Sequence, residues 1–137
     1  MNRSFQYKAQ IQEIPQIRND LEFLKKEWSV PESEIRQILV IIEELFSNIV
    51  RFAYNDQQEH KVDIKLTSRN HEIEIEIVDD GIPFNPLNHE NSRLSDPATS
   101  DAGGMGLTLI RAFSSNIAYQ RNSGQNHLTI IKKIKAK

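Results

Sequence analysis

Apolar residues recur with a helical period after the segment SVPES, as far as about Tyr54. At about 100° per residue, these positions fall on one side of a helix. They are Ile35, Ile38, Leu39, Ile42, Leu45, Phe46 and Ile49. Ser29 or Ser33 is expected to cap this helix, with Pro31 near its first turn. An earlier helix is expected over residues 15–28.

Alternation of apolar and polar residues predicts strands in much of the remaining chain. The segments are FQYKAQIQ (5–12), KVDIKLT (61–67), HEIEIEIVD (71–79), NIAYQR and HLTIIKKI. The second and third are joined by SRN and are expected to form a hairpin, with isoleucines on one face. Its other face carries glutamates that the lysines of the neighbouring strand can oppose. The last two segments predict a second hairpin around Asn122–Ser123–Gly124.

The order of these elements predicts an α+β fold, a two-layer sandwich in which helices cover one face of a mostly antiparallel, mixed sheet. Residues 1–137 are expected to form one domain, since the chain is long enough for a core and shows no linker or internal repeat. Residues 82–103 have no period and carry Pro83, Pro86 and Pro97. Because irregular loops of this length are often functional, the segment is expected to be a lid.

The long helix carries a narrow polar seam where a surface helix would carry lysine and glutamine. Glu44 and Asn48 stand four residues apart, so their side chains point into the same space. Val40, Ile41 and Phe52 flank them, which indicates that this side of the helix is covered as well. A carboxylate beside an amide suits a general base and an oxygen ligand for Mg²⁺. A solvent-facing pair is the common alternative for this spacing.

Two loop segments carry further candidate binding motifs. In VDDGIPF (78–84), Asp79 closes a strand and Gly81 lets the chain pass close to a ligand. The carboxylate could accept a hydrogen bond from an exocyclic amine such as that of adenine, although Asp-Gly turns at strand ends are common. In DAGGMGLTLI (101–110), glycines precede a helix expected at 106–115. Glycines at a helix N-terminus suit a phosphate, or else form an ordinary flexible loop.

Composition argues against several classes of protein. A net charge of −2 gives no general attraction to nucleic acid or to an anionic membrane, so neither is expected as a partner. The chain has no cysteine and therefore no disulfide or thiolate metal site, which fits a cytoplasmic protein. The longest apolar run, ILVII, is too short to span a bilayer, and the N-terminus shows no signal-peptide pattern.

Other nucleotide-binding motifs and metal-binding histidine patterns are also missing. The chain has no G-x-x-x-x-G-K-[ST] loop, which excludes a P-loop. GMGLTL lacks a third glycine and follows an irregular loop, so a dinucleotide fold is not expected. The histidines lie in loops or at strand ends without ligand spacing and are interpreted as surface residues: His60, His71, His89 and His127.

Three motifs occur in a recognisable order: E-x-x-x-N on a helix, D-x-G-x-P-F after a strand, and G-G-x-G-L before a helix. They resemble the N-box, G1 and G2 motifs of the Bergerat-fold ATPase superfamily of gyrase, histidine kinases and mismatch-repair ATPases. The resemblance runs from about Ile35 to the C-terminal hairpin. The compact size, the short lid, the P-F after G1, NIVRFAY and N-H-L-T-I make the chain most similar to the anti-sigma-factor serine kinases. This resemblance implies a Bergerat ATP-binding fold with ATP and Mg²⁺ as cofactors.

The same resemblance implies a role for each matching position. Asn48 would hold Mg²⁺ against the phosphates, and Glu44 would be the catalytic base toward an attacking hydroxyl. Asp79 would bind the adenine amino group in a pocket that Gly81 shapes. The phosphate end of the cofactor site would comprise Gly103, Gly104, Gly106, Leu107 and Thr108.

The resemblance leaves two functions open. The first is a serine/threonine kinase that phosphorylates an antagonist, anti-anti-sigma-like protein and sequesters a partner such as a sigma factor, with a homodimer implied by family likeness alone. The second is a nucleotide-gated protein-binding module with little or no kinase activity. Glu44 favours the kinase. The module is favoured by Phe52, where these kinases often have a histidine, and by Ser115, where they usually have an aspartate.

Overall fold

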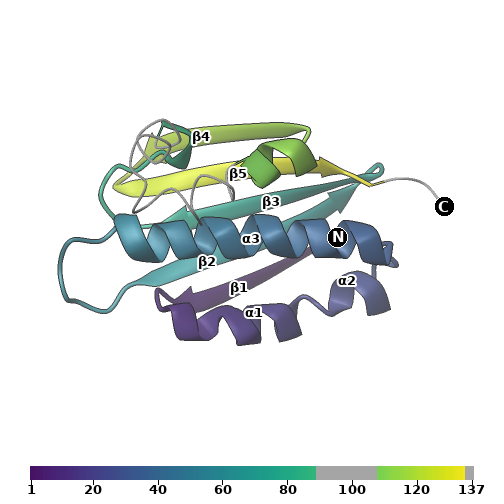
Figure 1. Ribbon diagram of the computed structural model, residues 1–137, viewed down its shortest axis with the longest axis horizontal. Helices are drawn as coiled ribbons and strands as arrows, with labels where there is room; N and C mark the ends of the chain where they lie inside the picture. Colours follow the sequence, from purple (N-terminus) through teal and green to yellow (C-terminus); the bar gives the residue numbers. More distant parts are fainter. Residues whose placement is uncertain (89–107, 135–137) are drawn as a thin grey trace.

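The computed structural model describes residues 1–88 and 108–134 of the chain. The strands are β1 (Asn2–Lys8), β2 (Lys61–Arg69), β3 (Glu72–Asp79), β4 (Asn116–Asn122) and β5 (Gln125–Lys133). The helices are η1 (Ile11–Glu13), α1 (Ile14–Asp20), α2 (Phe23–Lys26), α3 (Glu32–Phe52) and η2 (Pro86–Asn88). Residues 108–113 form a further short helix. Figure 1 looks onto the helices, with the sheet behind them.

The strands form one sheet in the order β1-β2-β3-β5-β4, and each neighbouring pair is antiparallel. The predicted α+β sandwich with helices on one face is therefore confirmed. Within the described residues the sheet is wholly antiparallel, not mixed. The predicted SRN turn is wrong, because β2 continues through Arg69 and the turn falls on Asn70 and His71, both with positive φ. The second hairpin turns at Ser123 and Gly124, as expected.

The core lies between the sheet and α3. Inward-facing residues of the strands alternate with outward-facing polar ones, and α3 packs a broad apolar surface against them. The fully buried core residues include Phe46, Ile38, Ile41, Ile42, Leu45, Ile64, Leu66 and Ile75. On the outer face, Lys65 stands opposite Glu76 in the β2–β3 register, which confirms the expected pairing of lysine and glutamate.

The buried side of α3 is rotated relative to the predicted stripe. Ile35 and Leu39 are half-exposed, whereas Ile41 and Asn48 are buried. Ile35 and Leu39 pack against the core as predicted but are only partly buried, because they also line a groove between α1–α2 and α3. The prediction that the polar side of α3 is covered holds at Asn48, which is 1% exposed.

The N-terminal elements differ from the sequence pattern in two places. The expected helix over 15–28 is divided into α1 and α2, and the division turns the Phe23 ring inward to pack on Trp28 at 4.8 Å between ring centroids. Neither Ser29 nor Ser33 caps α3. Ser29 has a positive φ, and the N-cap residue is Pro31, with no side-chain hydrogen bond. None of the helices in the part of the chain that the structure describes is long and apolar enough to cross a membrane.

The segment expected to be a lid is only partly described. Residues 82–88 pack against the fold through the buried side chains of Phe84 and Pro86, and η2 follows directly. These residues are therefore ordered by contacts that the sequence pattern did not indicate. Residues 89–103 lie outside the described residues, as do the first positions of the helix expected at 106–115. The described part of that helix ends at residue 113.

Candidate functional site

The C-terminal half of α3 places Glu44 and Asn48 about one helical turn apart on the same face of the helix. Glu44 is half-buried, whereas Asn48 is 1% exposed. Neither Nδ2 nor Oδ1 of Asn48 has a hydrogen-bond partner among the described residues. A buried polar group without a partner costs about 1–3 kcal/mol, so native proteins rarely keep one without a reason. An amide that is buried and unpaired in this way fits a residue that binds a ligand.

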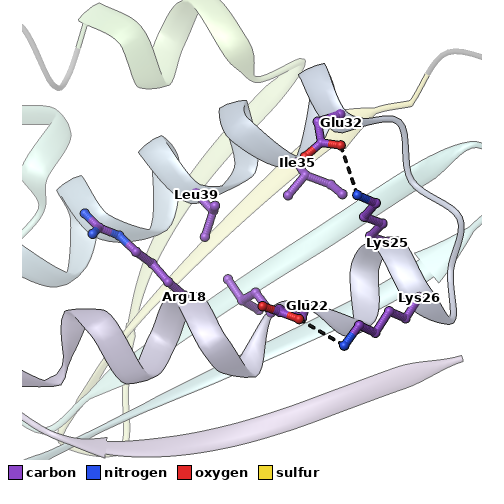
Figure 2. A pocket seen from close by; sticks show the side chains of 8 residues that line it. Arg18, Glu22, Lys25, Lys26, Glu32, Ile35 and Leu39 are labelled. Atoms are coloured by element: carbon purple, nitrogen blue, oxygen red, sulfur yellow. Dashed lines mark ion pairs between the residues drawn. The ribbon is translucent and has the colours of Figure 1, made fainter.

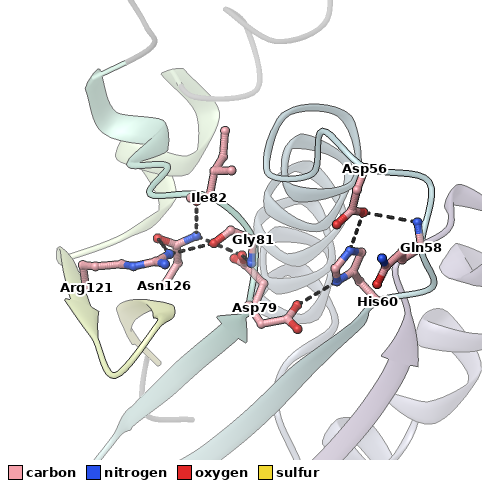
Figure 3. Close-up of polar contacts among 9 residues, drawn as sticks. Asp56, Gln58, His60, Asp79, Gly81, Ile82, Arg121 and Asn126 are labelled. Atoms are coloured by element: carbon pink, nitrogen blue, oxygen red, sulfur yellow. Dashed lines mark hydrogen bonds and ion pairs between the residues drawn. The ribbon is translucent and has the colours of Figure 1, made fainter.

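Asp79 ends β3 and is 3% exposed. Its Oδ1 atom accepts hydrogen bonds from the Gly81 backbone N–H at 2.9 Å and from Asn126 Nδ2 at 2.9 Å (Figure 3). These two donors fix the carboxylate on one side, and no hydrogen bond to Oδ2 is made within the described residues. Burial raises the pKa of the Asp79 carboxyl, and the bonds from Asn126 and Gly81 oppose that rise.

Gly81 is the point at which the turn after β3 touches the end of α3. A Cβ atom at this position would lie 2.7 Å from the Ala53 Cβ and would also collide with the Ala53 carbonyl. The same carbonyl accepts a hydrogen bond from the Ile82 N–H at 2.7 Å. The sequence indicates that this glycine permits a close approach to a ligand; the neighbour that the structure shows is the backbone of Ala53. The contact locks the Asp79 turn to the helix that carries Asn48.

Asn126 on β5 is a residue of the site to which the sequence motifs assigned no role. It is 3% exposed, and its Nδ2 donates to Asp79 Oδ1 at 2.9 Å and to the Ile82 carbonyl at 2.8 Å. A signal for it exists in the sequence. Inward positions of β5 carry apolar residues at Leu128 and Ile130, so an asparagine in the same register is out of pattern.

Three donors hold the other side of the Asn126 amide. Its Oδ1 accepts hydrogen bonds from the Phe84 N–H at 3.2 Å, the Tyr119 hydroxyl, and Arg121 Nη1 at 3.1 Å. Arg121 Nη1 also donates to the Gly81 carbonyl at 2.7 Å (Figure 3). The turn after β3 is thus bound to β4 and β5 by side chains as well as to α3 by its backbone.

The spacing along α3 separates two chemically different ends of the site. At 1.5 Å rise per residue, Glu44 lies about 13 Å along the helix axis from Ala53, which touches Gly81. Asn48 lies between them. A buried carboxylate able to accept from an amine is therefore at one end, and an amide followed by a second carboxylate is toward the other. This order suits a nucleotide, which has a nucleobase at one end and phosphates at the other.

The predicted phosphate end is only partly described. Thr108 is the first helical residue of the segment 108–113 and is exposed. The neighbouring Ile110 is buried and anchors this helix to the core. The other predicted positions lie outside the described residues: Gly103, Gly104, Gly106 and Leu107.

The positions at which the chain departs from the family pattern have defined surroundings. Phe52 is 38% exposed and lies against Phe84, with 5.9 Å between ring centroids. Ser115 precedes β4, where its N–H and its Oγ both donate to the Ile131 carbonyl at 2.8 and 3.0 Å. Ile131 lies toward the end of β5 away from Asn126, so Ser115 is at the edge of the sheet remote from the Asp79 turn.

A groove lies on the side of the molecule formed by α1, α2 and α3. The groove, of about 590 Å³, runs between α1–α2 and α3, with an apolar floor that includes Ile35 and Leu39 (Figure 2). Its charged rim is internally paired, through Lys25–Glu32 at 3.3 Å and Lys26–Glu22 at 3.1 Å. None of the motif residues that the structure describes lines it. It is therefore separate from the site around Asp79 and Asn48.

Comparison with known proteins agrees with this geometry. Residues 7–132 match the family model of the histidine kinase-like ATPase domain. The chain is 32% identical over 111 residues to the serine/threonine-protein kinase BtrW of Bordetella bronchiseptica, covering 78% of this chain and 75% of that protein. It is 27% identical over 85 residues to the anti-sigma F factor of Oceanobacillus iheyensis, covering 61% of this chain and 58% of that protein.

Solved structures share the fold. The RsbU and RsbW domains of a Mycobacterium tuberculosis protein superpose with a TM-score of 0.66 over 98% of this chain, at 16% identity. This chain spans 32% of that longer chain. The histidine kinase domain of a blue-light activated kinase from Erythrobacter litoralis gives a TM-score of 0.60 at 12% identity, over 90% of this chain and 60% of that chain.

The fold and the order of site residues define an ATPase domain of the Bergerat type. The chain belongs to the histidine kinase-like ATPase domain family. Within it, the predicted similarity to anti-sigma-factor serine kinases is confirmed by the relatives that it matches.

Proposed function

We propose that this protein binds ATP with Mg²⁺ and transfers the γ-phosphate to a serine or threonine of an antagonist protein. In the same proposal it sequesters a second protein, such as a sigma factor. The observation that carries the proposal is the buried, unpaired Asn48 amide on the helix that also locks the Asp79 turn. The names of the related kinase and anti-sigma factor support the same role.

The residues present fit a magnesium–phosphate group. Asn48 Oδ1 is an oxygen acceptor without a partner among the described residues, and Mg²⁺ binds oxygen ligands while sharing its shell with phosphates and water. When bound, the ion would neutralise charge on the phosphates during transfer. Asn48 would hold the ion, and Glu44 lies one turn further from the base-recognition end of the site.

In this proposal Glu44 takes the proton of the substrate hydroxyl. In the proposed reaction the substrate hydroxyl oxygen forms a bond to the γ-phosphorus, and the bond to the β–γ bridging oxygen breaks. The hydroxyl proton passes to the Glu44 carboxylate, and ADP leaves with the bridging oxygen. Because phosphoryl transfer depends on positioning and electrostatics, a base fixed on a rigid helix suits this step.

Asp79 supports a preference for adenine. Its Oδ1 atom is occupied by the Gly81 N–H and Asn126, so the remaining oxygen can accept from the exocyclic amine of adenine. Guanine presents a carbonyl at the corresponding position, which a carboxylate repels. The site should therefore bind ATP and ADP more tightly than GTP.

We expect Asp79→Asn to lower ATP affinity at least about tenfold, because a buried charged acceptor contributes about 1.5–3 kcal/mol. Isothermal calorimetry with Mg-ATP and Mg-GTP measures both affinity and base preference. Asp63→Asn, which alters an exposed carboxylate on β2 outside this turn, serves as the comparison and should keep the affinity for ATP and the preference for adenine. Equal ATP affinity in the Asp79 variant and the wild type would remove Asp79 from the site.

We expect Asn48→Leu to abolish Mg²⁺-dependent nucleotide binding without destabilising the ligand-free protein. The substitution removes a buried unpaired amide, whose burial costs about 1–3 kcal/mol. Thermal unfolding without ligand and calorimetry with Mg-ATP test the two halves separately. Asn48→Ala distinguishes crowding by leucine from loss of the amide. If both variants bind Mg-ATP normally, Asn48 is not the metal ligand.

A second function is supported by a specific observation. The Ser115 hydroxyl donates a hydrogen bond to the Ile131 carbonyl, at the end of the sheet remote from Asp79. The Phe52 side chain has no group that can gain or lose a proton. A nucleotide-gated binding module with little phosphotransfer would tolerate both residues. Incubation with ATP labelled at the γ-phosphate and a candidate antagonist protein separates the two functions. Label on a serine or threonine of the antagonist supports the kinase, and nucleotide-dependent binding without label supports the module.

A further inference from the structure

His60 lies between two carboxylates and an aromatic ring. Its Nε2 is 2.7 Å from Asp56 Oδ1 (Figure 3). Its Nδ1 is 3.2 Å from Asp80 Oδ1. The ring stacks on Tyr54, with 4.1 Å between centroids and 14° between planes. The imidazole is only 15% exposed, so this histidine is not the simple surface residue that the sequence pattern indicated. We refer to His60, Asp56 and Asp80 as the histidine clamp.

The histidine clamp connects the segment after α3 to the turn after β3. Asp80 directly follows Asp79 and precedes Gly81, whereas Tyr54 directly follows Ala53, the residue against which Gly81 packs. His60 and Asp80 line the same hollow as Gly81, with a volume of about 280 Å³. Through this clamp, the loop after α3 is tied to the turn after β3 beside the buried Asp79 carboxylate.

The protonation state of the imidazole decides whether both contacts can exist. A carboxylate accepts hydrogen bonds and donates none, so two carboxylates require two N–H donors on the ring. Only the imidazolium has both. A neutral imidazole would present one lone pair to a carboxylate, and that contact would open.

We propose that His60 is a positioning residue for the nucleotide site, whose imidazolium holds the Asp79–Gly81 turn against the end of α3 in the geometry that binds adenine. The proposal rests on the proposed nucleotide binding and extends it: affinity for ATP is coupled to the charge on His60. His60 need not touch the nucleotide, since it acts through Asp80 and the turn.

The charges around the clamp favour the imidazolium. The hydrogen bond that the His60 ring donates to Asp56 is the largest influence raising the pKa of His60, and Asp80 adds to it against the effect of burial. The same bond lowers the pKa of Asp56. Burial raises the pKa of Tyr54, so its hydroxyl stays neutral across the titration of His60. Other charged groups near the clamp in the described part of the chain include Lys61, Asp79 and Glu59, which pairs with Lys8 at 3.5 Å. Arg121 donates a hydrogen bond to the Gly81 carbonyl.

The sign of the pH effect follows from the raised pKa of His60. The stabilisation of the Asp79–Gly81 turn by the clamp is complete below the ordinary histidine pKa of about 6.5. It is lost as the pH rises through the higher pKa of His60 in the folded protein. Asp79 acts in the opposite sense, because protonation of its carboxyl at low pH removes the acceptor for adenine. ATP affinity should therefore fall on both sides of an optimum.

The test is calorimetry of Mg-ATP binding between about pH 5.5 and about pH 9 with the wild type and His60→Gln. We expect the wild-type affinity to fall about fivefold on the alkaline side, a typical size for such coupling. His60→Gln should show no alkaline fall and should bind at pH 6 as weakly as the wild type binds at high pH. Protonation of Asp79 should affect both proteins alike. Titration of the nucleotide phosphates affects both equally and cancels in the comparison.

Two further variants sharpen the result. Asp80→Asn keeps an acceptor but removes a charge, so the alkaline limb should move to lower pH, and proton NMR of the His60 ring should show its pKa moving with it. His71→Gln, in the exposed turn at the opposite end of β3, should leave the profile unchanged. An alkaline limb that persists in His60→Gln, or is missing from the wild type, would overturn this inference alone. No ATP binding by the wild type at any pH would overturn the proposed function together with it.

Discussion

We expect Glu44→Gln to slow phosphate transfer to the antagonist protein by about 10²–10⁴-fold, the usual contribution of a positioned general base. Glutamine keeps the shape of the side chain but cannot take the hydroxyl proton. ATP affinity should be unchanged, because the base acts in the transition state and not in ground-state binding. Single-turnover transfer from labelled ATP measures the first quantity, and calorimetry the second.

Glu43→Gln is the matched control for this variant. Glu43 is the preceding residue on α3 and pairs with Arg18 at 2.7 Å, on a side of the helix rotated about 100° from Glu44. Its loss should leave the transfer rate unchanged. Equal rates in Glu44→Gln and the wild type would exclude Glu44 as the base. A parallel loss of ATP affinity and transfer rate would assign it a binding role instead.

We expect Lys132→Met to destabilise the fold by about 3–5 kcal/mol, because it leaves a buried carboxylate without its partner. Lys132 Nζ on β5 lies 2.8 Å from Glu34 Oε2 in the first turn of α3, and the two side chains are 6% and 9% exposed. That loss is a large part of the roughly 5–15 kcal/mol by which single domains are stable. Urea unfolding followed by circular dichroism measures it, with an unchanged slope as the check that unfolding remains two-state.

The double variant Glu34→Met/Lys132→Met separates a lost charge partner from lost packing. Removing both charges should restore stability to about the wild-type value or above it, as with other buried pairs replaced by apolar residues. Lys26→Met is the surface comparison, because Lys26 pairs with Glu22 at 3.1 Å with both side chains mostly exposed. It should change stability by less than about 1 kcal/mol. A Lys132→Met protein as stable as the wild type would show that Glu34 is not held as a buried charge.

Local pattern was enough to predict the architecture. Alternation in KVDIKLT and HEIEIEIVD fixes which side chains of β2 and β3 face the core, and a slip by one residue would bury the glutamates. The helical period likewise identifies α3. The pattern did not predict how fully each residue is buried. Ile35 and Leu39 have the same period as the fully buried residues, but they are only partly buried because they line a groove between α1–α2 and α3.

The motif residues could be identified from the sequence because their chemistry is unusual for their local setting. Asn48 is a polar residue on an apolar helix, and Asp79 and Gly81 interrupt the end of a strand. The motifs E-x-x-x-N and D-x-G-x-P-F therefore predict both ends of the candidate site. Asn126 carries the same kind of signal, a polar residue at an inward strand position, but its partners could not be read from the chain.

The sequence by itself determined the period of each main element, the inward face of each strand, and the residue types available to a nucleotide site. The tertiary structure alone decided which distant residues meet: Asn126 with Asp79, Gly81 with Ala53, His60 with Asp80, and Lys132 with Glu34. The physical reason is that periodicity reports the environment of a residue along its own helix or strand. Contacts between elements depend on the register of the sheet and on how α3 lies across it, and these are set by packing of the whole core.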